Sequence, residues 1–329
     1  MNDKSVLTDE ELKKAYEVVG NLKKYYQDRI VGQESLCDSL IISMMANSHL
    51  LIESVPGLAK TTAAKIITNA VNGKFSRIQC TPDLLPSDII GGQIFNYANS
   101  CFDTKLGPVF ANFILLDEIN RSSAKTQSAM LEAMQERSVT IGARTYNLED
   151  VFVVIATQNP IEQEGTYTLA EAQVDRFLIK EKLIYPSIDE EVTVLNRLES
   201  NIIDESNPIY NLDAVLFLQT VTKKVYIDEK IKRYIAQIID ATRYPKKYID
   251  PRIADFVVMG ASPRGSIAFM EASKANAIIN GRSYVTPDDI KVVANRVLRH
   301  RITLSFQALA SNVEPEYIID AIMKVIPTP

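Results

Sequence analysis

The chain has 329 residues, 46% of them hydrophobic and 23% charged, and these proportions exclude a disordered protein. Its length exceeds one ordinary domain, so we expect two domains, and the chain is long enough to bury a sizeable core. The net charge of −5 disfavours a broad nucleic-acid surface, because neutralising phosphates takes clustered Lys and Arg, although a ring of subunits could line a pore with few basic residues each.

The cysteines, the histidines and the apolar runs of the sequence indicate the cellular compartment and the metal chemistry to expect. Three cysteines, Cys37, Cys80 and Cys101, form no CxxC pair, which favours a reducing compartment and buried thiols. With 2 histidines in the chain, we expect no zinc site. We see no apolar signal-peptide core at the N-terminus, and no apolar run reaches the roughly 18 residues of a membrane span. A cytoplasmic protein without a membrane span is therefore expected.

Strands and helices are predicted to alternate through the first part of the chain. Thr8 and Glu11 form a capping-box pattern that opens a helix, and a second helix runs through Met45. The predicted strands are short apolar runs at residues 49–53, 75–79, 112–117 and 151–157. The helices that follow the first and third strands cover residues 61–70 and 123–135. Such buried strands between helices indicate a parallel sheet covered on both faces.

A predicted hairpin and the C-terminal part of the chain depart from this alternation. Alternating side chains around Gly142 predict a β-hairpin at residues 139–146. Beyond about residue 187 we find helical periodicity and no convincing strand, and Thr286 and Pro287 open one helix as N-cap and first residue. The predicted fold is therefore an α/β domain at residues 1–190, followed by a smaller all-helical domain at residues 191–329.

The turn after the first strand has the composition of a phosphate-binding loop. Small residues let backbone N–H groups turn toward phosphates, while a lysine reaches the terminal phosphates and a hydroxyl reaches Mg²⁺. Lys60 and Thr61 supply those groups, whereas Ser54 and Ala59 stand where the general pattern has glycine. A simple strand-to-helix turn is the alternative, and the flanking strand and helix argue against it. The predicted nucleotide-binding residues of the loop are Pro56, Gly57, Leu58, Ala59, Lys60, Thr61 and Thr62.

Polar residues end the third and fourth predicted strands. Asp117 and Glu118 follow an apolar run, and in P-loop ATPases such an aspartate holds Mg²⁺ while the glutamate deprotonates the attacking water. An acidic strand end that faces solvent is the alternative. Asn159 is an amide placed to contact the γ-phosphate or that water, although an Asn before Pro is usually a turn former. The predicted cofactors are ATP and Mg²⁺, with Thr61 and Asp117 as the metal ligands.

With these parts in order, the sequence resembles the AAA+ superfamily and, more narrowly, its MoxR family of chaperone-like ATPases. The resemblance runs from about Ile30 to Arg301, and it implies a P-loop AAA+ core, a parallel sheet flanked by helices, with a smaller all-α lid domain. Ser54 and Ala59 depart from the superfamily pattern, and because a Cβ restricts positive φ, a lowered nucleotide affinity is expected. The stretches that carry the resemblance are residues 80–88, 117–121, 131–136, 156–167, 171–177 and 260–264.

The resemblance also implies a role for each candidate residue of the first domain. Lys60 and Thr61 would be the Walker A pair, and Asp117 and Glu118 would be the Walker B pair. Asn159 would be sensor 1. The helix-2 insert and the pre-sensor-1 hairpin of the family would correspond to residues 84–93 and 139–146.

Two arginines and two residues near the N-terminus complete the implied site. Arg176 would be the arginine finger, offered to the nucleotide of a neighbouring subunit, with a surface salt bridge as the alternative reading. Arg264 would be sensor 2, on the γ-phosphate bound by its own subunit. Val31 and Gly32 would lie against the adenine.

The resemblance implies an ATP-driven remodeller of protein complexes as the leading hypothesis. Such a protein would form a homo-oligomeric ring, a hexamer, and would mature client proteins, often through a partner with a von Willebrand A-type domain. The second hypothesis is an ATP-dependent nucleic-acid motor of the helix-2-insert branch, against which the apolar and acidic insert argues. A third is a nucleotide-gated scaffold with little turnover, against which Glu118 and Arg176 argue.

Overall fold

The computed structural model describes residues 6–98, 100–160, 167, 169–199 and 207–329. Part of the signature at residues 156–167, namely 161–166, lies outside the described residues. The chain forms two compact units, which we name the sheet unit and the helical unit. The sheet unit comprises Asn21–Gln173 and Glu181–Leu216, and the helical unit comprises Met1–Gly20, Val174–Lys180 and Phe217–Pro329. Because these units interleave along the sequence, they set no single boundary, and the division at residue 190 remains a prediction.

A five-stranded sheet with the order β2-β5-β8-β1-β9 forms the centre of the sheet unit. The pairs β2–β5, β5–β8 and β8–β1 are parallel, and all side chains of β5 are buried. Four of these strands confirm the predicted runs. Strand β9 was not predicted, because three of its four residues are charged. The strands are β1 (Leu50–Glu53), β2 (Phe75–Gln79), β5 (Phe113–Asp117), β8 (Val153–Gln158) and β9 (Ile179–Lys182).

The helices at Asp9–Gln27, Lys60–Ala70 and Ala124–Glu136 begin within one residue of their predicted starts, whereas the short helices at Pro86–Ile90 and Glu171–Val174 were not predicted. In α1 the Thr8 N–H donates to the Glu11 carboxylate and the Glu11 N–H donates to the Thr8 hydroxyl, which confirms the capping box. The Ser123 hydroxyl caps α5 by accepting the Thr126 N–H. Helix α2 packs on β1, and α3 packs on β5. The helices are α1 (Asp9–Gln27), α2 (Glu34–Met45), α3 (Lys60–Ala70), α4 (Pro86–Ile90), α5 (Ala124–Glu136), α6 (Glu171–Val174) and α7 (Ile188–Glu199), with a 3-10 turn at Ile119–Arg121.

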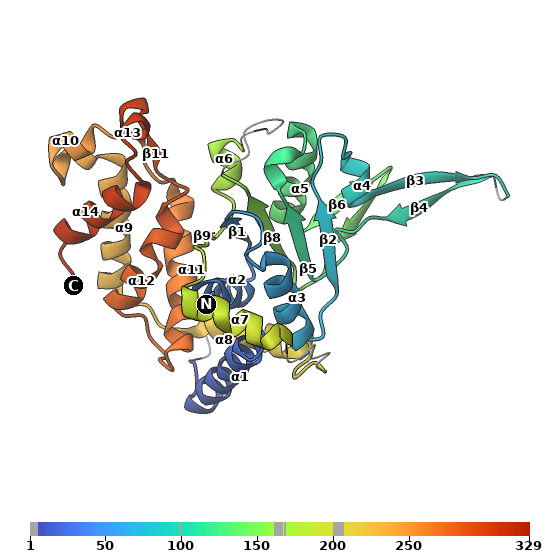
Figure 1. Cartoon of the computed structure of the whole chain (residues 1–329), viewed down its shortest axis with the longest axis horizontal. Helices are drawn as coiled ribbons and strands as arrows, with labels where there is room; N and C mark the ends of the chain where they lie inside the picture. The colour runs from blue at the N-terminus through green and yellow to red at the C-terminus, as the bar shows by residue number, and fades with distance from the viewer. Residues whose placement is uncertain (1–5, 99, 161–166, 168, 200–206) are drawn as a thin grey trace. The chain divides into compact units, whose positions relative to one another are not determined.

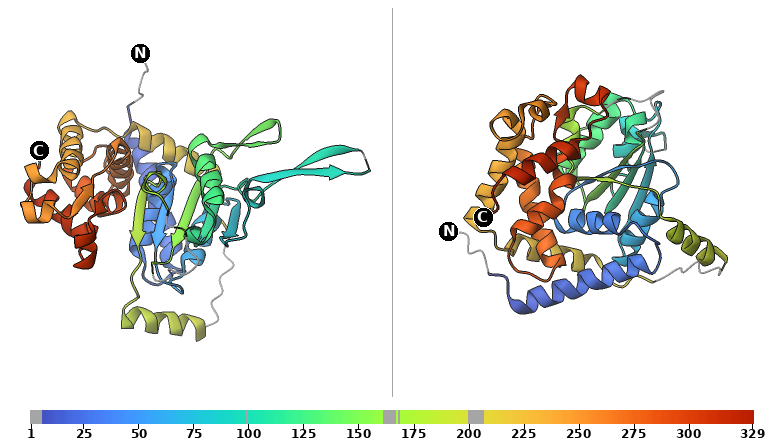
Figure 2. Two further views of the ribbon diagram at one scale, coloured as in Figure 1. Left: turned by 90° about the horizontal axis from the view of Figure 1, so that it is seen from above. Right: turned by 60° about the vertical axis from the view of Figure 1, so that its left-hand side comes forward.

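Two β-hairpins extend from the sheet unit on the same side (Figures 1 and 2). The predicted hairpin is confirmed as β6 (Ser138–Ile141) paired antiparallel with β7 (Arg144–Asn147), with Gly142 at a φ of 61° in the turn. The longer hairpin pairs β3 (Gly91–Asn96) with β4 (Cys101–Leu106) and was not predicted, because only its start was included in the insert at residues 84–93. The two hairpins contact each other, and the Tyr146 hydroxyl donates to Thr104 Oγ1 at 3.3 Å.

The C-terminal part of the chain is helical apart from one short ribbon. The expectation of no strand was wrong for β10 (Val257–Met259) and β11 (Thr303–Leu304), which are too short to show an apolar period. The predicted start of α12 is confirmed, since Thr286 and Asp289 form a capping box with Pro287 in the first turn. The helices are α8 (Leu212–Lys224), α9 (Glu229–Arg243), α10 (Pro251–Ala254), α11 (Pro263–Ile279), α12 (Pro287–Leu298), α13 (Phe306–Ala310) and α14 (Pro315–Val325), with a 3-10 turn at Pro245–Lys247.

Two further expectations concern the burial of the cysteines and the presence of a membrane-spanning helix. Cys37 and Cys80 are buried, as predicted, whereas Cys101 is exposed because it lies on β4 of the extended hairpin. Among the helices of the described ranges, none combines the length and the apolar composition that a membrane crossing needs.

Both units bury a neutral histidine. The Nδ1 of His49 accepts the Val154 N–H at 3.1 Å, and its Nε2 lies 3.2 Å from the Met134 carbonyl oxygen, which fits a neutral ring with one donor and one acceptor. Burial lowers the pKa of His49 to about 3. Burial in the helical unit also lowers the pKa of His300, whose Nε2 lies 3.1 Å from the Phe177 carbonyl oxygen.

The free energy of unfolding is therefore expected to fall as the pH drops below about 6.5, by roughly 1.4 kcal/mol per pH unit for each buried histidine. Each histidine has a lower pKa in the folded protein than in the unfolded chain. Its contribution to the free energy of unfolding is therefore complete above the unfolded pKa and is lost as the pH falls toward the folded pKa. Urea denaturation over a series of pH values measures this slope. The variant His49→Gln should reduce it, and an equal slope in both proteins would contradict the assignment.

Candidate functional site

The turn between β1 and α3 has the backbone of an anion-binding loop. Gly57 has a φ of 86°, and a Cβ there would meet no heavy atom within 4 Å, so open space faces the loop. Ala59 is the N-cap of α3 with a φ of 53°, and no side chain caps that helix, which leaves its positive end facing the loop. Of the two positions that depart from glycine, Ala59 alone has a left-handed φ, so the expected backbone strain applies there and not at Ser54.

The two acids after β5 are held by a threonine on the neighbouring strand. The Thr157 hydroxyl donates to Asp117 Oδ1 at 3.0 Å and accepts the Glu118 N–H at 2.8 Å. Glu118 has a φ of 57°, an uncommon conformation for a residue with a side chain, and the bond from its N–H to Thr157 fixes it. Thr157 was not among the predicted site residues, because a threonine inside an apolar strand is typical of any β-strand.

The lysine of the loop lies in the electrostatic field of both acids. Burial lowers the pKa of Lys60, while the negative charges of Asp117 and Glu118 act against that shift. The parallel register explains this proximity, because the carboxyl ends of β1, β8 and β5 lie at one edge of the sheet. The structure thus brings together the predicted Lys60, Asp117 and Glu118.

Two further arginines pair with these acids. Arg77 on β2 donates to Asp117 Oδ2 at 2.5 Å, and Arg121 donates to Glu118 Oε2 at 3.0 Å. Both guanidinium groups are partly exposed, whereas the acids are mostly buried. The one signal for Arg77 in the sequence is its charge, because Arg77 lies inside a predicted strand that otherwise has no charged residue.

The remaining loop residues and Asn159 belong to the same sheet unit. Asn159 is buried directly after β8, the strand between β1 and β5. Leu58 is buried, Thr61 is half-buried, and Pro56 and Thr62 are exposed. A half-buried hydroxyl at the first turn of α3 and a nearby carboxylate are groups that could hold Mg²⁺ together with a nucleotide phosphate.

The predicted adenine-binding residues precede α2. Gly32 has a φ of 67°, which disfavours any residue with a side chain, and a Cβ there would lie 2.5 Å from the Glu190 carboxylate. The same carboxylate accepts the N–H and the hydroxyl of Ser187 at 2.7 and 2.9 Å, which fixes the start of α7. Val31 is partly exposed beside this contact.

The two predicted phosphate-binding arginines are in the helical unit. Arg176 lies half-buried between α6 and β9, and Arg264 is exposed in the first turn of α11, where its N–H donates to the Ser262 hydroxyl at 3.0 Å. The loop, the acids and Asn159 are in the sheet unit. The roles of Arg176 and Arg264 therefore remain predictions.

A phosphate loop after the first strand of a parallel sheet, two acids at the end of another strand and a polar residue on the strand between them define a P-loop ATPase of the AAA+ class. Comparison with family models agrees. A model described as the ATPase family associated with various cellular activities (AAA) matches residues 49–179, and one described as an AAA lid domain matches residues 249–322.

Individual relatives narrow the class to one family. The chain is 43% identical to Chaperone MoxR1 of Mycobacterium tuberculosis over 91% of this chain and 79% of that protein. It is 41% identical to the uncharacterized protein YeaC of Bacillus subtilis over 95% of each chain. A crystal structure of a candidate ATPase from Cytophaga hutchinsonii is 42% identical, with a TM-score of 0.91 over 97% of both chains. The chain belongs to the MoxR family of AAA+ ATPases, and its activity is ATP hydrolysis.

Proposed function

We propose that the chain assembles into a hexameric ring and uses Mg²⁺-dependent ATP hydrolysis to remodel or mature protein complexes. Lys60 would bind the terminal phosphates of ATP, and Glu118 would accept the proton of the attacking water. The ring would supply the remaining positive charge from a neighbouring subunit through Arg176. The resemblance adds that clients would be reached through a partner with a von Willebrand A-type domain.

The residues at the end of β5 and the start of α3 fit a magnesium ion. A carboxylate offers about four lone-pair sites, so Asp117 retains acceptor capacity beyond its bonds from Thr157 and Arg77. Mg²⁺ commonly binds through one or two protein oxygens and the substrate phosphates, and we assign those protein oxygens to Asp117 and Thr61. When bound, the ion would neutralise the charge of the phosphates. The lysine and the helix N-terminus would orient them.

The observation that favours a protein client is an exposed aromatic cluster on the β3–β4 hairpin. The Phe95 ring lies 5.0 Å from that of Tyr97 and 5.2 Å from that of Phe102, both edge to face. These three side chains are 39, 87 and 63% exposed, and Ile94 on the same hairpin is 55% exposed. An aromatic patch on a hairpin that extends from the sheet unit is typical of a surface that binds apolar side chains.

The charges of the two hairpins argue against the nucleic-acid motor. Residues 86–106 and 138–147 hold Lys105 and Arg144 as cations, against Asp88 and Asp103. A groove that binds single-stranded nucleic acid combines aromatic side chains with an excess of cations, whereas the two cations of these hairpins are matched by two acids. ATP turnover stimulated by single-stranded DNA, with a stimulation that weakens in salt, would favour the motor instead.

The double variant Phe95→Ser, Phe102→Ser is expected to retain basal ATP turnover and to lose client capture, because the aromatic cluster lies on the hairpin and not in the ATP site. Capture is measured by a pull-down of the Glu118→Gln protein held in ATP, with and without the two serine substitutions. Phe306→Ser is the matched control, since Phe306 is 86% exposed on the helical unit. Equal capture by the hairpin variant and the control would contradict a client role for the cluster.

A further inference from the structure

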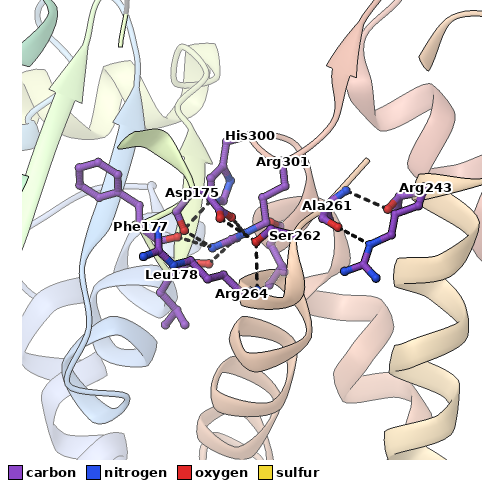
Figure 3. Close-up of polar contacts among 11 residues, drawn as sticks. Asp175, Phe177, Leu178, Arg243, Ala261, Ser262, Arg264, His300 and Arg301 are labelled. Atoms are coloured by element: carbon purple, nitrogen blue, oxygen red, sulfur yellow. Dashed lines mark hydrogen bonds and ion pairs between the residues drawn. The ribbon is translucent and has the colours of Figure 1, made fainter. Parts of the chain in front are cut away.

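A buried arginine ties the segment that carries Arg176 to the helices of its unit (Figure 3). Arg301 is 6% exposed and follows α12. Its guanidinium group donates five hydrogen bonds of 2.6 to 3.1 Å, the full number that it can make. The acceptors are the Asp175 carboxylate and the carbonyl oxygens of Asp175, Phe177, Leu178 and Val297.

The Asp175 carboxylate connects the same segment to the start of α11. One of its oxygens accepts Arg301 Nε at 2.8 Å, and the other accepts the Ser262 hydroxyl at 2.7 Å. Ser262 is the N-cap of α11 and accepts the Arg264 N–H at 3.0 Å. A continuous path of hydrogen bonds therefore runs from the residue beside Arg176 to the backbone of Arg264 (Figure 3).

The turn before Ser262 is also fixed, so the path ends on a rigid element. The Ala261 N–H donates to the Thr242 hydroxyl at 3.0 Å, and its carbonyl oxygen accepts Arg243 Nε at 2.8 Å. A Cβ on Gly260 would lie 2.3 Å from the Thr242 carbonyl oxygen, so the two backbones are in direct contact. A partly buried network whose central guanidinium group makes all of its hydrogen bonds holds its members in one geometry.

We propose that Asp175, Ser262 and Arg301 are positioning residues that make Arg176 and Arg264 move as one body, so that nucleotide sensed by Arg264 in one subunit is transmitted to the finger offered to its neighbour. The inference rests on the proposed roles of Arg176 and Arg264. The observation behind it is that residues Val174–Lys180, which follow β8 in the sequence and include the start of β9, belong to the compact helical unit. The path Arg301–Asp175–Ser262 holds that segment against the N-terminus of α11.

Hydrogen exchange of the full-length ring tests this linkage without measuring turnover. Every protein carries Arg176→Ala, so that the finger cannot touch a neighbour's nucleotide directly. Two peptides are followed with and without an ATP analogue that is not hydrolysed: residues 174–180 and residues 261–269. Asp175→Ala removes the carboxylate that joins the segment to Ser262 and leaves both the α11 cap and the Arg301 bonds to backbone carbonyl oxygens intact. Ser262→Ala is the second variant, and it removes the same connection from the α11 side. Ser305→Ala is the control, because Ser305 caps α13 by accepting the Ala308 N–H and takes no part in the path.

The linkage predicts that the analogue slows exchange of both peptides, by about tenfold at residues 174–180. Asp175→Ala should abolish the slowing at residues 174–180 and keep it at 261–269, and Ser305→Ala should change neither. Slowing at 261–269 alone, or slowing at 174–180 that survives Asp175→Ala and Ser262→Ala, would overturn the linkage. If both variants lose the slowing of exchange at both peptides, the bonds only maintain the fold, and this result would also overturn the linkage. Slowing of neither peptide before any link is broken would overturn the proposed role of Arg264 itself.

Discussion

Replacement of Glu118 by Gln is expected to lower ATP turnover by about 10²–10⁴-fold while ATP remains bound. The amide keeps the size of the side chain and its bond from Arg121, but it cannot accept the proton of the attacking water. Thr157 and the left-handed backbone hold Glu118 in place independently of its charge, so the loop geometry should persist. Single-turnover hydrolysis, together with binding of a fluorescent ATP analogue, separates the chemical step from affinity.

Glu132→Gln serves as the matched control, because Glu132 is exposed on α5 of the same unit. It should leave both binding and turnover unchanged. If Glu118→Gln hydrolyses ATP at the rate of the Glu132 variant, Glu118 is not the base.

Arg176→Ala is expected to lower turnover by about 10³–10⁵-fold, the range that an arginine finger contributes to phosphoryl transfer. Because the proposed finger acts on a neighbour, the variant should bind ATP in its own loop with unchanged affinity. Steady-state hydrolysis at concentrations above and below ring assembly measures the effect. Arg252→Ala, at an exposed arginine of α10, is the control and should behave as the unaltered protein. A loss of less than about tenfold would contradict the finger assignment.

The parts of the fold that the sequence predicts are those with a strong local pattern. The apolar run at residues 112–117 forms the fully buried β5, because an unbroken apolar run is itself the signal of a buried strand. Thr286 and Pro287 form the capped start of α12, because a helix cap is made by residues adjacent in the sequence. Strand β9 was not predicted, because Ile179 is its one apolar residue and its other buried side chain is that of Glu181. The β3–β4 hairpin escaped prediction because its alternation is aromatic and exposed, without the buried face that identifies a strand.

The residues of the candidate site also fall into those that a local pattern predicts and those that it does not. Lys60, Asp117 and Glu118 have residue types and spacing that indicate phosphate chemistry by themselves, and the structure places them together. Thr157 and Arg301 act through partners that are distant in the sequence, so nothing local distinguishes them. Arg77 has a distant partner too, and its only local signal is a charge inside a predicted strand. Arg301 is the clearest case, because its burial depends on carbonyl oxygens more than 120 residues away, as in its bond to Phe177, 124 residues distant.

The loop itself shows what a departure from a pattern can mean. Ser54 is buried with a backbone that needs no glycine, and its hydroxyl donates to the Val55 carbonyl oxygen at 3.1 Å. Ala59 occupies a left-handed conformation that costs a residue with a side chain about 1–2 kcal/mol. The expected effect on nucleotide affinity thus concerns Ala59 and not Ser54.

The central claim is that two subunits share each ATP site, and mixed rings test it most directly. Glu118→Gln subunits retain Arg176, and Arg176→Ala subunits retain Glu118, so each protein alone should be inactive. In an equal mixture half of the sites retain the base and half of their neighbours retain the finger, so turnover should recover to about one quarter of the unaltered protein. Recovery to that level would support the shared site, and a mixture as inactive as its two components would contradict it.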